Sequence, residues 1–242
     1  MILLSSFVFG LVFGSFLNVV IYRLKTRQNI VFGGSFCPEC KTRLSWYDLI
    51  PLLSFIYLRG RCRYCHKKIS WQYPIVELIS GLLWVLVFYK FGISLINIYY
   101  LFVFSLFLVT AVYDFKWRII PDKIVYPAIV IALIYNLFNT LSLFVAFAAF
   151  LFFFLIFYFS SGRAMGLGDA KLALLIGLFL NPLSAVVAFA LAFVIGAVSG
   201  IILIGLGKKT LKSQIAFGPF LVLGATIAFF LSDFISNFVS FL

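Results

Sequence analysis

Long apolar runs separated by short polar connections dominate the chain. One polar segment, residues 23–72, interrupts this pattern. The apolar runs approach the roughly 20 residues that an α-helix needs to cross a membrane. Asn181 and Pro182 supply a turn signal that divides the longest run. The pattern therefore predicts eight helices, at residues 1–22, 74–89, 94–113, 123–139, 141–160, 170–180, 183–206 and 216–237.

The composition agrees with a chain whose solvent is lipid. The 242 residues are 64% hydrophobic and 11% charged, and the mean hydropathy is +1.18. The first apolar run has no positive charge before it and no small-residue cleavage site, so we expect a retained helix and not a signal peptide. The predicted fold is an all-α polytopic membrane protein with lipid as its main partner.

The net charge of +12 would suit a nucleic-acid partner, but its distribution excludes that class. Ten of the 19 Lys and Arg residues lie between Arg23 and Lys68. The others lie almost entirely in short connections, as the positive-inside rule requires. We therefore place residues 23–68 in the cytoplasm and both termini outside. If 171–207 were one helix, three lysines would face outward against the rule: Lys208, Lys209 and Lys212.

These assignments give four expected domains. The first transmembrane helix covers residues 1–22, and a cytoplasmic four-cysteine domain covers 23–73. The second transmembrane helix and its connection cover 74–93. Residues 94–242 form the remaining six-helix membrane domain.

The four cysteines form two CxxC pairs in the polar segment, separated by 21 residues: Cys37, Cys40, Cys62 and Cys65. This spacing is typical of a zinc ribbon, in which two knuckles complete a tetrahedral sulfur site. We also expect a small apolar core between the pairs, with the metal supplying much of the folding energy. The expected core residues are Leu44, Trp46, Leu49, Ile50, Leu52, Leu53, Phe55 and Ile56.

Disulfides or redox-active pairs are the alternative reading of these cysteines. A cytoplasmic location disfavours disulfides, because thiols are kept reduced there. His66, the only histidine, adjoins Cys65 and is a possible spare ligand, but four sulfurs already close a structural site. We therefore expect His66 to be a solvated residue.

The chain has only seven acidic residues, so a carboxylate within apolar sequence is a functional candidate. Asp114 ends the third predicted helix, and Asp169 opens the sixth at the same membrane boundary. Two carboxylates brought together share a proton, so one activates water while the other acts as an acid. Gly166 and Gly168 allow close approach of a helix or an extended substrate.

Each of these acidic residues also has a purely structural interpretation. An Asp that opens a helix is commonly an N-cap, and a lone GxGD sequence is weak evidence. For Asp122, just after Pro121, we expect the capping role. Asp233 is expected at the external boundary.

Taken together, the motifs resemble the prepilin peptidases of bacterial type IV pilus, type II secretion and competence systems. The resemblance runs through nearly the whole chain. It comprises the two CxxC pairs and the segments Gly14-Ser-Phe-Leu-Asn-Val-Val-Ile-Tyr-Arg23, Leu44-Ser-Trp-Tyr-Asp-Leu-Ile-Pro-Leu-Leu-Ser54, Arg59-Gly-Arg-Cys62, Tyr73-Pro-Ile-Val-Glu77, Asp114 to Asp122, Gly166-Leu-Gly-Asp-Ala-Lys171 and Phe217-Gly-Pro219.

The resemblance implies a GxGD-type aspartyl protease with Asp114 and Asp169 as its catalytic pair. It also implies prepilin or pseudopilin substrates, a bacterial inner-membrane location and an active site at the cytoplasmic face. Members often methylate the new N-terminal residue with S-adenosylmethionine, and this activity rests here on resemblance alone. Glu77 is our candidate for it, and an equally good interpretation is a carboxylate that stabilises the cysteine domain against the membrane.

Three other classes remain to be weighed. Tyr113-Asp114 and Gly-Leu-Gly-Asp169 also look like presenilin and signal peptide peptidase, which would not bring the cysteine domain. A proton-coupled transporter also uses paired carboxylates, but near the midplane and with repeats. A zinc-stapled assembly scaffold would keep its function without either aspartate.

Overall fold

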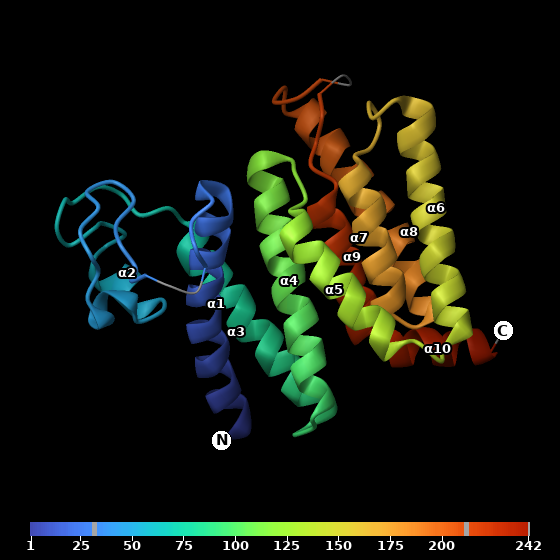
Figure 1. Ribbon diagram of the computed structural model, residues 1–242, viewed down its shortest axis with the longest axis horizontal. Coiled ribbons are helices and arrows are strands. Elements are labelled where there is room, and N and C mark those ends of the chain that lie inside the picture. The colour runs from blue at the N-terminus through green and yellow to red at the C-terminus, as the bar shows by residue number, and fades with distance from the viewer. Residues whose placement is uncertain (31–32, 211–212, 242) are drawn as a thin grey trace. The chain divides into compact units, whose positions relative to one another are not determined.

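The computed structural model describes residues 1–30, 33–210 and 213–241, which form helices and loops (Figure 1). Strand-like pairing among them is limited to two isolated bridges, so the expected all-α fold is confirmed. The elements are α1 (Ile2–Thr26), the 3-10 helix η1 (Trp46–Leu49), α2 (Leu53–Tyr57), α3 (Gln72–Phe91), α4 (Ile96–Trp117), α5 (Asp122–Tyr135), α6 (Thr140–Ser160), α7 (Leu167–Phe179), α8 (Pro182–Gly205), α9 (Gly218–Phe230) and α10 (Ser232–Phe241).

The chain is a multi-pass membrane protein. Among the described residues, five helices are long and apolar enough to cross a bilayer, namely α1, α3, α4, α6 and α8, and the bent pair α9 and α10 makes a sixth if it counts as one span. α5 and α7 have 14 and 13 residues. At a rise of 1.5 Å they are about 21 Å and about 20 Å long, short of a hydrocarbon core of roughly 30 Å. The predicted count of eight spans is not confirmed.

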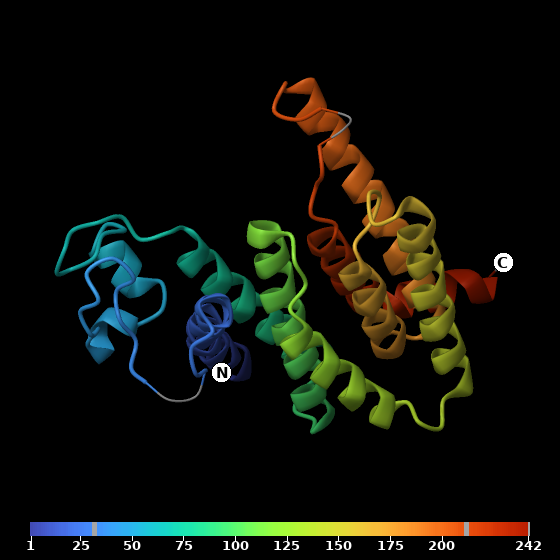
Figure 2. The same cartoon turned by 45° about the horizontal axis from the view of Figure 1, so that its top comes forward.

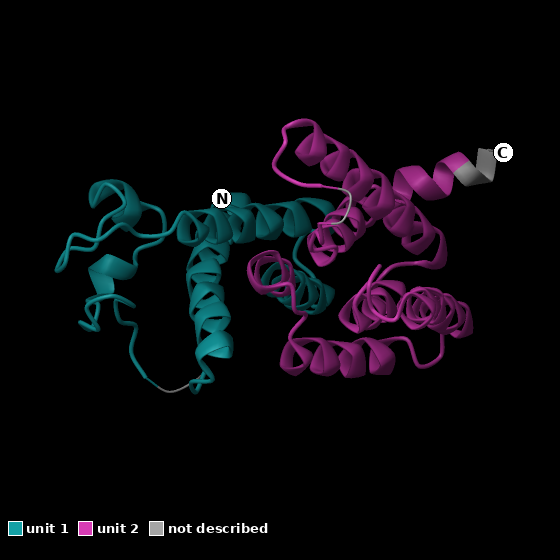
Figure 3. Cartoon of the chain, turned by 90° about the horizontal axis from the view of Figure 1, so that it is seen from above, with its two compact units in different colours: residues 1–109 teal, residues 110–242 magenta. Residues whose placement is uncertain are grey.

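Two compact units make up the chain, Met1–Val109 and Thr110–Leu242, coloured separately in Figure 3. In the first unit, α1 and α3 pack through small residues. A Cβ added at Gly10 would lie 2.8 Å from the Cα of Gly81, and one at Gly14 would lie 2.7 Å from the Cα of Glu77. The two backbones are therefore nearly in contact, as in other small-residue packing of membrane helices.

The polar segment between α1 and α3 does not form the small apolar core that we expected. Its only buried apolar side chains, among the residues described, are Cys37 and Cys62. Trp46, Leu53 and Ile56 are exposed instead. The segment is too short to enclose a core, and the paired knuckles and polar contacts hold it together.

In the second unit, α7 is the central helix. It packs against α5, α6 and α9, and Figures 1 and 2 show it running alongside α6. A Cβ at Gly177 would lie 2.6 Å from the Cα of Ala146 on α6. The buried Asn136, just after α5, donates to the carbonyl of Leu178 at 2.7 Å. The short helices α5 and α7 are therefore held in place by contacts with each other and with α6.

The predicted break at Asn181 and Pro182 is confirmed. α7 ends at Phe179, and α8 begins at Pro182. Asn181 is the N-cap of α8, and its side chain accepts a hydrogen bond from the amide of Ser184 at 2.8 Å. Asparagine before a first-turn proline is a strong helix-start signal.

The last predicted helix, 216–237, is in fact two helices. α9 ends at Phe230 and α10 begins at Ser232, with an angle of 69° between them. Ser232 and Asp233 have short polar side chains that favour helix starts over helix interiors. The apolar pattern alone did not reveal this bend.

Candidate functional site

Asp114 lies in the last turn of α4 and is buried. Its Oδ2 accepts a hydrogen bond from the backbone N–H of Gly218 at 3.0 Å. Gly218 is the first residue of α9. The free N–H groups and the dipole of a helix N-terminus favour a carboxylate there.

Asp169 lies in the first turn of α7 and is half-buried. Its Oδ2 accepts a hydrogen bond from the backbone N–H of Gly166, the N-cap residue, at 3.1 Å. Part of its role is therefore the structural one, closing the start of α7. The carboxyl groups of Asp114 and Asp169 are close enough to interact electrostatically. The fold thus brings together two carboxylates that lie far apart in the sequence.

The two glycines before Asp169 have different surroundings. A Cβ at Gly168 would lie 2.8 Å from the Cβ of Ile120, so this backbone does approach the α4–α5 connection closely. A Cβ at Gly166 would meet nothing nearer than the Asp169 carboxylate, at 3.5 Å. Gly166 is exposed, and its surface is open to an extended peptide.

Asp122 does not cap α5 with its side chain, contrary to our expectation. The N-cap of α5 is Pro121, and Asp122 is already helical. Its Oδ1 instead pairs with Nζ of Lys171 on α7 at 2.7 Å. The Lys171 ammonium also lies 4.8 Å from the ring centroid of Tyr126. Asp122 therefore joins α5 to α7 beside the carboxylate pair.

The four cysteines converge as their spacing predicts. All four are free thiols, and their sulfur atoms lie within 4.8 Å of one another. The Cys37 and Cys65 sulfurs are 3.9 Å apart. A tetrahedral Zn²⁺ site with bonds of about 2.3 Å has sulfur–sulfur edges of about 3.8 Å, so the cluster fits a metal ion. His66 is exposed and stands outside the cluster.

The thiols of the cluster have unequal acidities. Hydrogen bonds from the side chain and backbone of Thr42 lower the pKa of Cys40 to about 6. The backbone N–H of Lys67 lowers the pKa of Cys65, but burial and the other cysteines outweigh it and raise this pKa to about 11. The Cys40 and Cys65 thiols therefore ionise at different pH values and not as two equivalent groups.

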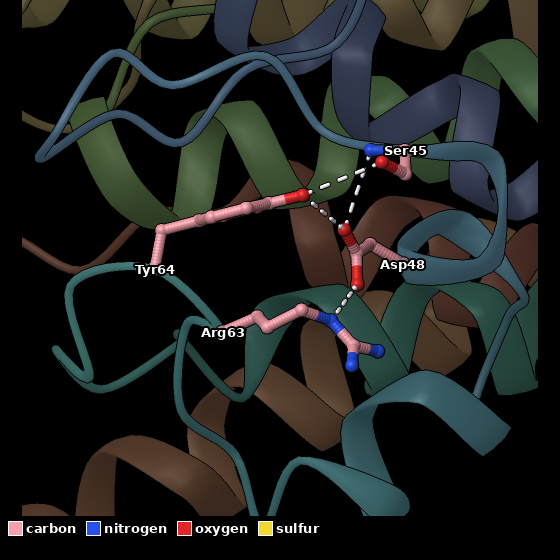
Figure 4. A network of polar contacts seen from close by, with 4 residues as sticks. All are labelled: Ser45, Asp48, Arg63 and Tyr64. Carbon is pink, nitrogen blue, oxygen red and sulfur yellow. Dashed lines mark hydrogen bonds and ion pairs between the residues drawn. The ribbon is translucent and has the colours of Figure 1, made fainter.

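A polar network joins the second knuckle to η1 (Figure 4). The Asp48 side chain is 3% exposed and pairs with Nε of Arg63 at 2.7 Å. Its other oxygen accepts from the hydroxyl of Tyr64 and from the backbone N–H of Ser45, both at 3.2 Å. Arg63 and Tyr64 stand between Cys62 and Cys65, so Asp48 fixes the loop that carries two of the four sulfurs.

Glu77 is buried in α3 and is engaged with the cysteine domain. Its Oε2 accepts a hydrogen bond from the backbone N–H of Leu52 at 2.9 Å, and it also receives a hydrogen bond from the side chain of Ser15. This geometry matches the second role that we considered, a carboxylate that holds the domain against the membrane helices.

Two residues of this framework have roles that sequence reasoning did not find. Gly218 appeared only as part of a motif, although Gly-Pro at a helix start is a signal for exposed N–H groups. Arg23 appeared only as a positive charge and as the end of a motif. It is buried, and among the described residues its guanidinium donates to the loop carbonyls of Asn29, Ile30, Gly33 and Gly34 at 2.7 to 3.1 Å.

Fold and site together define a multi-pass helical membrane protein that has a carboxylate pair in one unit and a four-cysteine domain in the other. The chain belongs to the type IV leader peptidase family. The model of that family matches residues 101–201, and the model of the bacterial peptidase A24 N-terminal domain matches residues 8–91.

Curated relatives agree with this assignment. The chain is 36% identical to a prepilin leader peptidase/N-methyltransferase of Klebsiella pneumoniae, over 73% of this chain and 85% of the relative. It is 35% identical to the protein of that name from Vibrio cholerae, over 74% and 81%. With the Bacillus subtilis protein of that name it shares 34% identity over 80% of each chain. No solved structure gives a significant match.

Proposed function

We propose that this chain cleaves the leader peptide from prepilins, with Asp114 and Asp169 as the catalytic pair, and then methylates the new N-terminus. Family membership and the names of the relatives support the two activities. The catalytic assignment is carried by one observation. Two carboxylates, each held by a backbone N–H at a helix start, lie within electrostatic reach of each other.

The chemistry follows from a proton shared between the two carboxyl groups. The ionised carboxylate removes a proton from water as the water oxygen attacks the scissile carbonyl carbon. The protonated partner donates to the carbonyl oxygen, and the leaving amine is protonated when the C–N bond breaks. The exposed backbone at Gly166 offers an edge for the extended peptide, and Gly168 keeps α7 against Ile120.

The substrate has a basic leader ahead of an apolar helix in this proposal. Its helix lies in lipid beside the enzyme, and its scissile bond lies at the membrane boundary, where water is available. We place this boundary on the cytoplasmic side of the inner membrane, because the positive charges of the loops favour that side. Prepilins and pseudopilins share this pattern, and both are proposed substrates.

The proposed topology keeps eight membrane-embedded helical segments and external termini. α5 and α7 are two of these segments despite their length, since eight of the 13 residues of α7 are buried and this helix packs against α5, α6 and α9. Residues 94–242 then form the peptidase domain, and residues 23–73 form the cytoplasmic cysteine domain. The Lys208 to Lys212 connection includes residues 211 and 212, which lie outside the described residues.

We propose structural zinc as the ion of the four-cysteine cluster, with Cys37, Cys40, Cys62 and Cys65 as its ligands. Bound zinc would supply folding energy to a segment whose described residues form no apolar core. Glu77, our candidate residue for the S-adenosylmethionine-dependent activity, fits that cofactor poorly. The Glu77 carboxylate is taken up by Leu52 and Ser15, so it does not suit direct contact with that cofactor. In this proposal Glu77 affects methylation only by holding the Leu52 turn.

The decisive experiment compares purified variants on a prepilin with S-adenosylmethionine, with mass spectrometry of the mature N-terminus. Asp114→Asn and Asp169→Asn keep the shape but remove the shared proton, so each should reduce cleavage by about two to four orders of magnitude. Asp122→Asn, whose native side chain forms a partly exposed ion pair, is the matched control and should be much milder. If either catalytic variant trims prepilin at the wild-type rate, the aspartyl assignment fails.

A further inference from the structure

The short helix α2 in the cysteine domain presents its apolar side chains outward. The exposed fractions of Leu53, Ile56 and Tyr57 are 66%, 70% and 79%. Trp46 and Trp71 in the same domain are also exposed. Single exposed apolar residues are common in proteins, but a cluster of this kind marks a surface that meets an apolar partner.

The position of α2 along α3 indicates its depth. Leu52, the N-cap residue of α2, donates its N–H to Glu77 at 2.9 Å. Glu77 lies five residues into α3, which is about 7.5 Å along the helix axis. Figure 1 likewise shows α2 beside the body of α1, not beyond its C-terminal end. The start of α2 is therefore deeper than the start of the spanning helix α3.

The backbone at this point is constrained by its contacts. Leu52 has a φ of 58°, in the left-handed region that a leucine rarely adopts and that costs on the order of 1 kcal/mol or more. The Glu77 carboxylate fixes this turn from the membrane side. The short helix α2, Leu53 to Tyr57, starts directly after this turn.

An aromatic contact links α2 to the start of α3. The ring of Phe55 packs on Trp71, with centroids 5.1 Å apart. Trp71 is the N-cap residue of α3, where interfacial aromatic residues gather in membrane proteins. Ile75 and Leu78, one and two turns further along α3, are also exposed. The Phe55–Trp71 contact therefore joins α2 to the start of a helix that is apolar enough to cross the bilayer and that also exposes apolar side chains.

Positive charge borders the apolar face of α2. Arg59 and Arg61 follow α2 directly, and both are exposed. Apolar and aromatic residues bordered by arginines are the pattern of a segment that lies in the membrane interface beside anionic headgroups. A lipid leaflet satisfies the depth, the apolar face and the charge together.

We propose that α2 inserts into the bilayer interface on the side of the cysteine domain. Leu53, Ile56 and Tyr57 contact lipid, and Arg59 and Arg61 lie at the phosphate level. The insertion holds the four-cysteine domain flat against the membrane and explains why a buried carboxylate of α3 binds a loop of that domain. This inference rests on membrane embedding and not on the peptidase assignment, so failure of one leaves the other standing.

The test uses the full-length zinc-loaded protein in nanodiscs containing phosphatidylglycerol. The photoreactive residue p-benzoylphenylalanine replaces Ile56, or Leu82 on the lipid-facing side of α3, or the exposed Pro38 in the first knuckle. We expect phospholipid adducts, detected by mass spectrometry, at positions 56 and 82 and not at 38. Adducts at 82 without adducts at 56 would overturn the proposal. Cross-linking of position 56 only to added prepilin, or to a second copy of the chain, would overturn it as well.

A second variant tests whether the apolar face itself causes insertion. Leu53→Asn combined with Ile56→Asn removes apolar groups from an exposed surface, so zinc content and adducts at position 82 should remain. Lipid adducts from a probe at position 57 should fall sharply. Unchanged adducts at 57 in this zinc-loaded variant would contradict the role of these side chains.

Discussion

The backbone N–H of Gly218 donates to Oδ2 of Asp114 at 3.0 Å, across 104 positions of the sequence. This bond joins the first turn of α9 to the last turn of α4 and makes the two oxygens of the carboxylate inequivalent. The partial positive charge of the α9 N-terminus stabilises an anion at this position. In the proposed catalytic role Asp114 must keep one orientation through the reaction, and this contact fixes the orientation of its carboxylate.

Gly218→Ala should separate catalysis from folding. A Cβ at this position would lie 2.7 Å from Oδ2 of Asp114, so the carboxylate must move. Displacement of a reacting group by about 1 Å reduces rates by up to about 100-fold. We expect prepilin cleavage to fall by about 10- to 100-fold, with little change in the thermal unfolding midpoint or in zinc content.

Gly205→Ala is the matched control, because a Cβ there meets no other atom within 4 Å. It should cleave prepilin at the wild-type rate. Equal rates for the two alanine variants would show that the Asp114 contact is irrelevant to cleavage.

The pH dependence of cleavage should be bell-shaped. The proposed reaction needs one ionised and one protonated carboxyl group, so activity falls at low pH when both are protonated and at high pH when both are ionised. The two apparent pKa values belong to the pair and not to either residue. Steady-state rates on a detergent-solubilised prepilin across the pH range measure this. A rate with no alkaline decline would mean that no shared proton takes part.

Local signals in the sequence predicted most of the helices and the cysteine cluster. Apolar runs and the Asn181-Pro182 turn marked the helices, and CxxC spacing brought four sulfurs together. Contacts between distant segments were not predictable in this way. The bond between Gly218 and Asp114 and the ion pair between Asp122 and Lys171 arise only when helices pack. Apolarity also does not distinguish a core from a lipid-facing surface, so Leu53 and Ile56 were wrongly expected inside.

The proposed topology predicts on which side of the membrane three positions lie: Asn139, Lys208 and the C-terminus. Reporter fusions just before Asn139 and at the C-terminus should report a location on the external side of the membrane, and a fusion at Lys208 should report a cytoplasmic location. Asn139 caps α6, so insertions are best placed just before it. A cytoplasmic C-terminus would mean that the helical segments from α7 onward do not alternate as proposed.

Two ion pairs in the cysteine domain offer a matched test of how the metal site is held. Asp48 pairs with Arg63 through a side chain that is 3% exposed, whereas Glu39 pairs with Lys67 with side chains that are 52% and 64% exposed. Exposed pairs contribute at most about 1 kcal/mol, but loss of a buried partner leaves polar groups unsatisfied.

Asp48→Asn should therefore loosen the loop that carries Cys62 and Cys65. Mutation of residues that support metal ligands typically lowers the metal affinity by about 10- to 100-fold. We expect the zinc affinity of Asp48→Asn to fall within that range. Competition with a chromophoric chelator measures the affinity, and prepilin is not needed. Glu39→Gln, next to Cys40 but exposed, should retain zinc almost as the wild type does. If Asp48→Asn holds zinc as tightly as Glu39→Gln, the cysteines alone define the site and the Asp48 network does not support it.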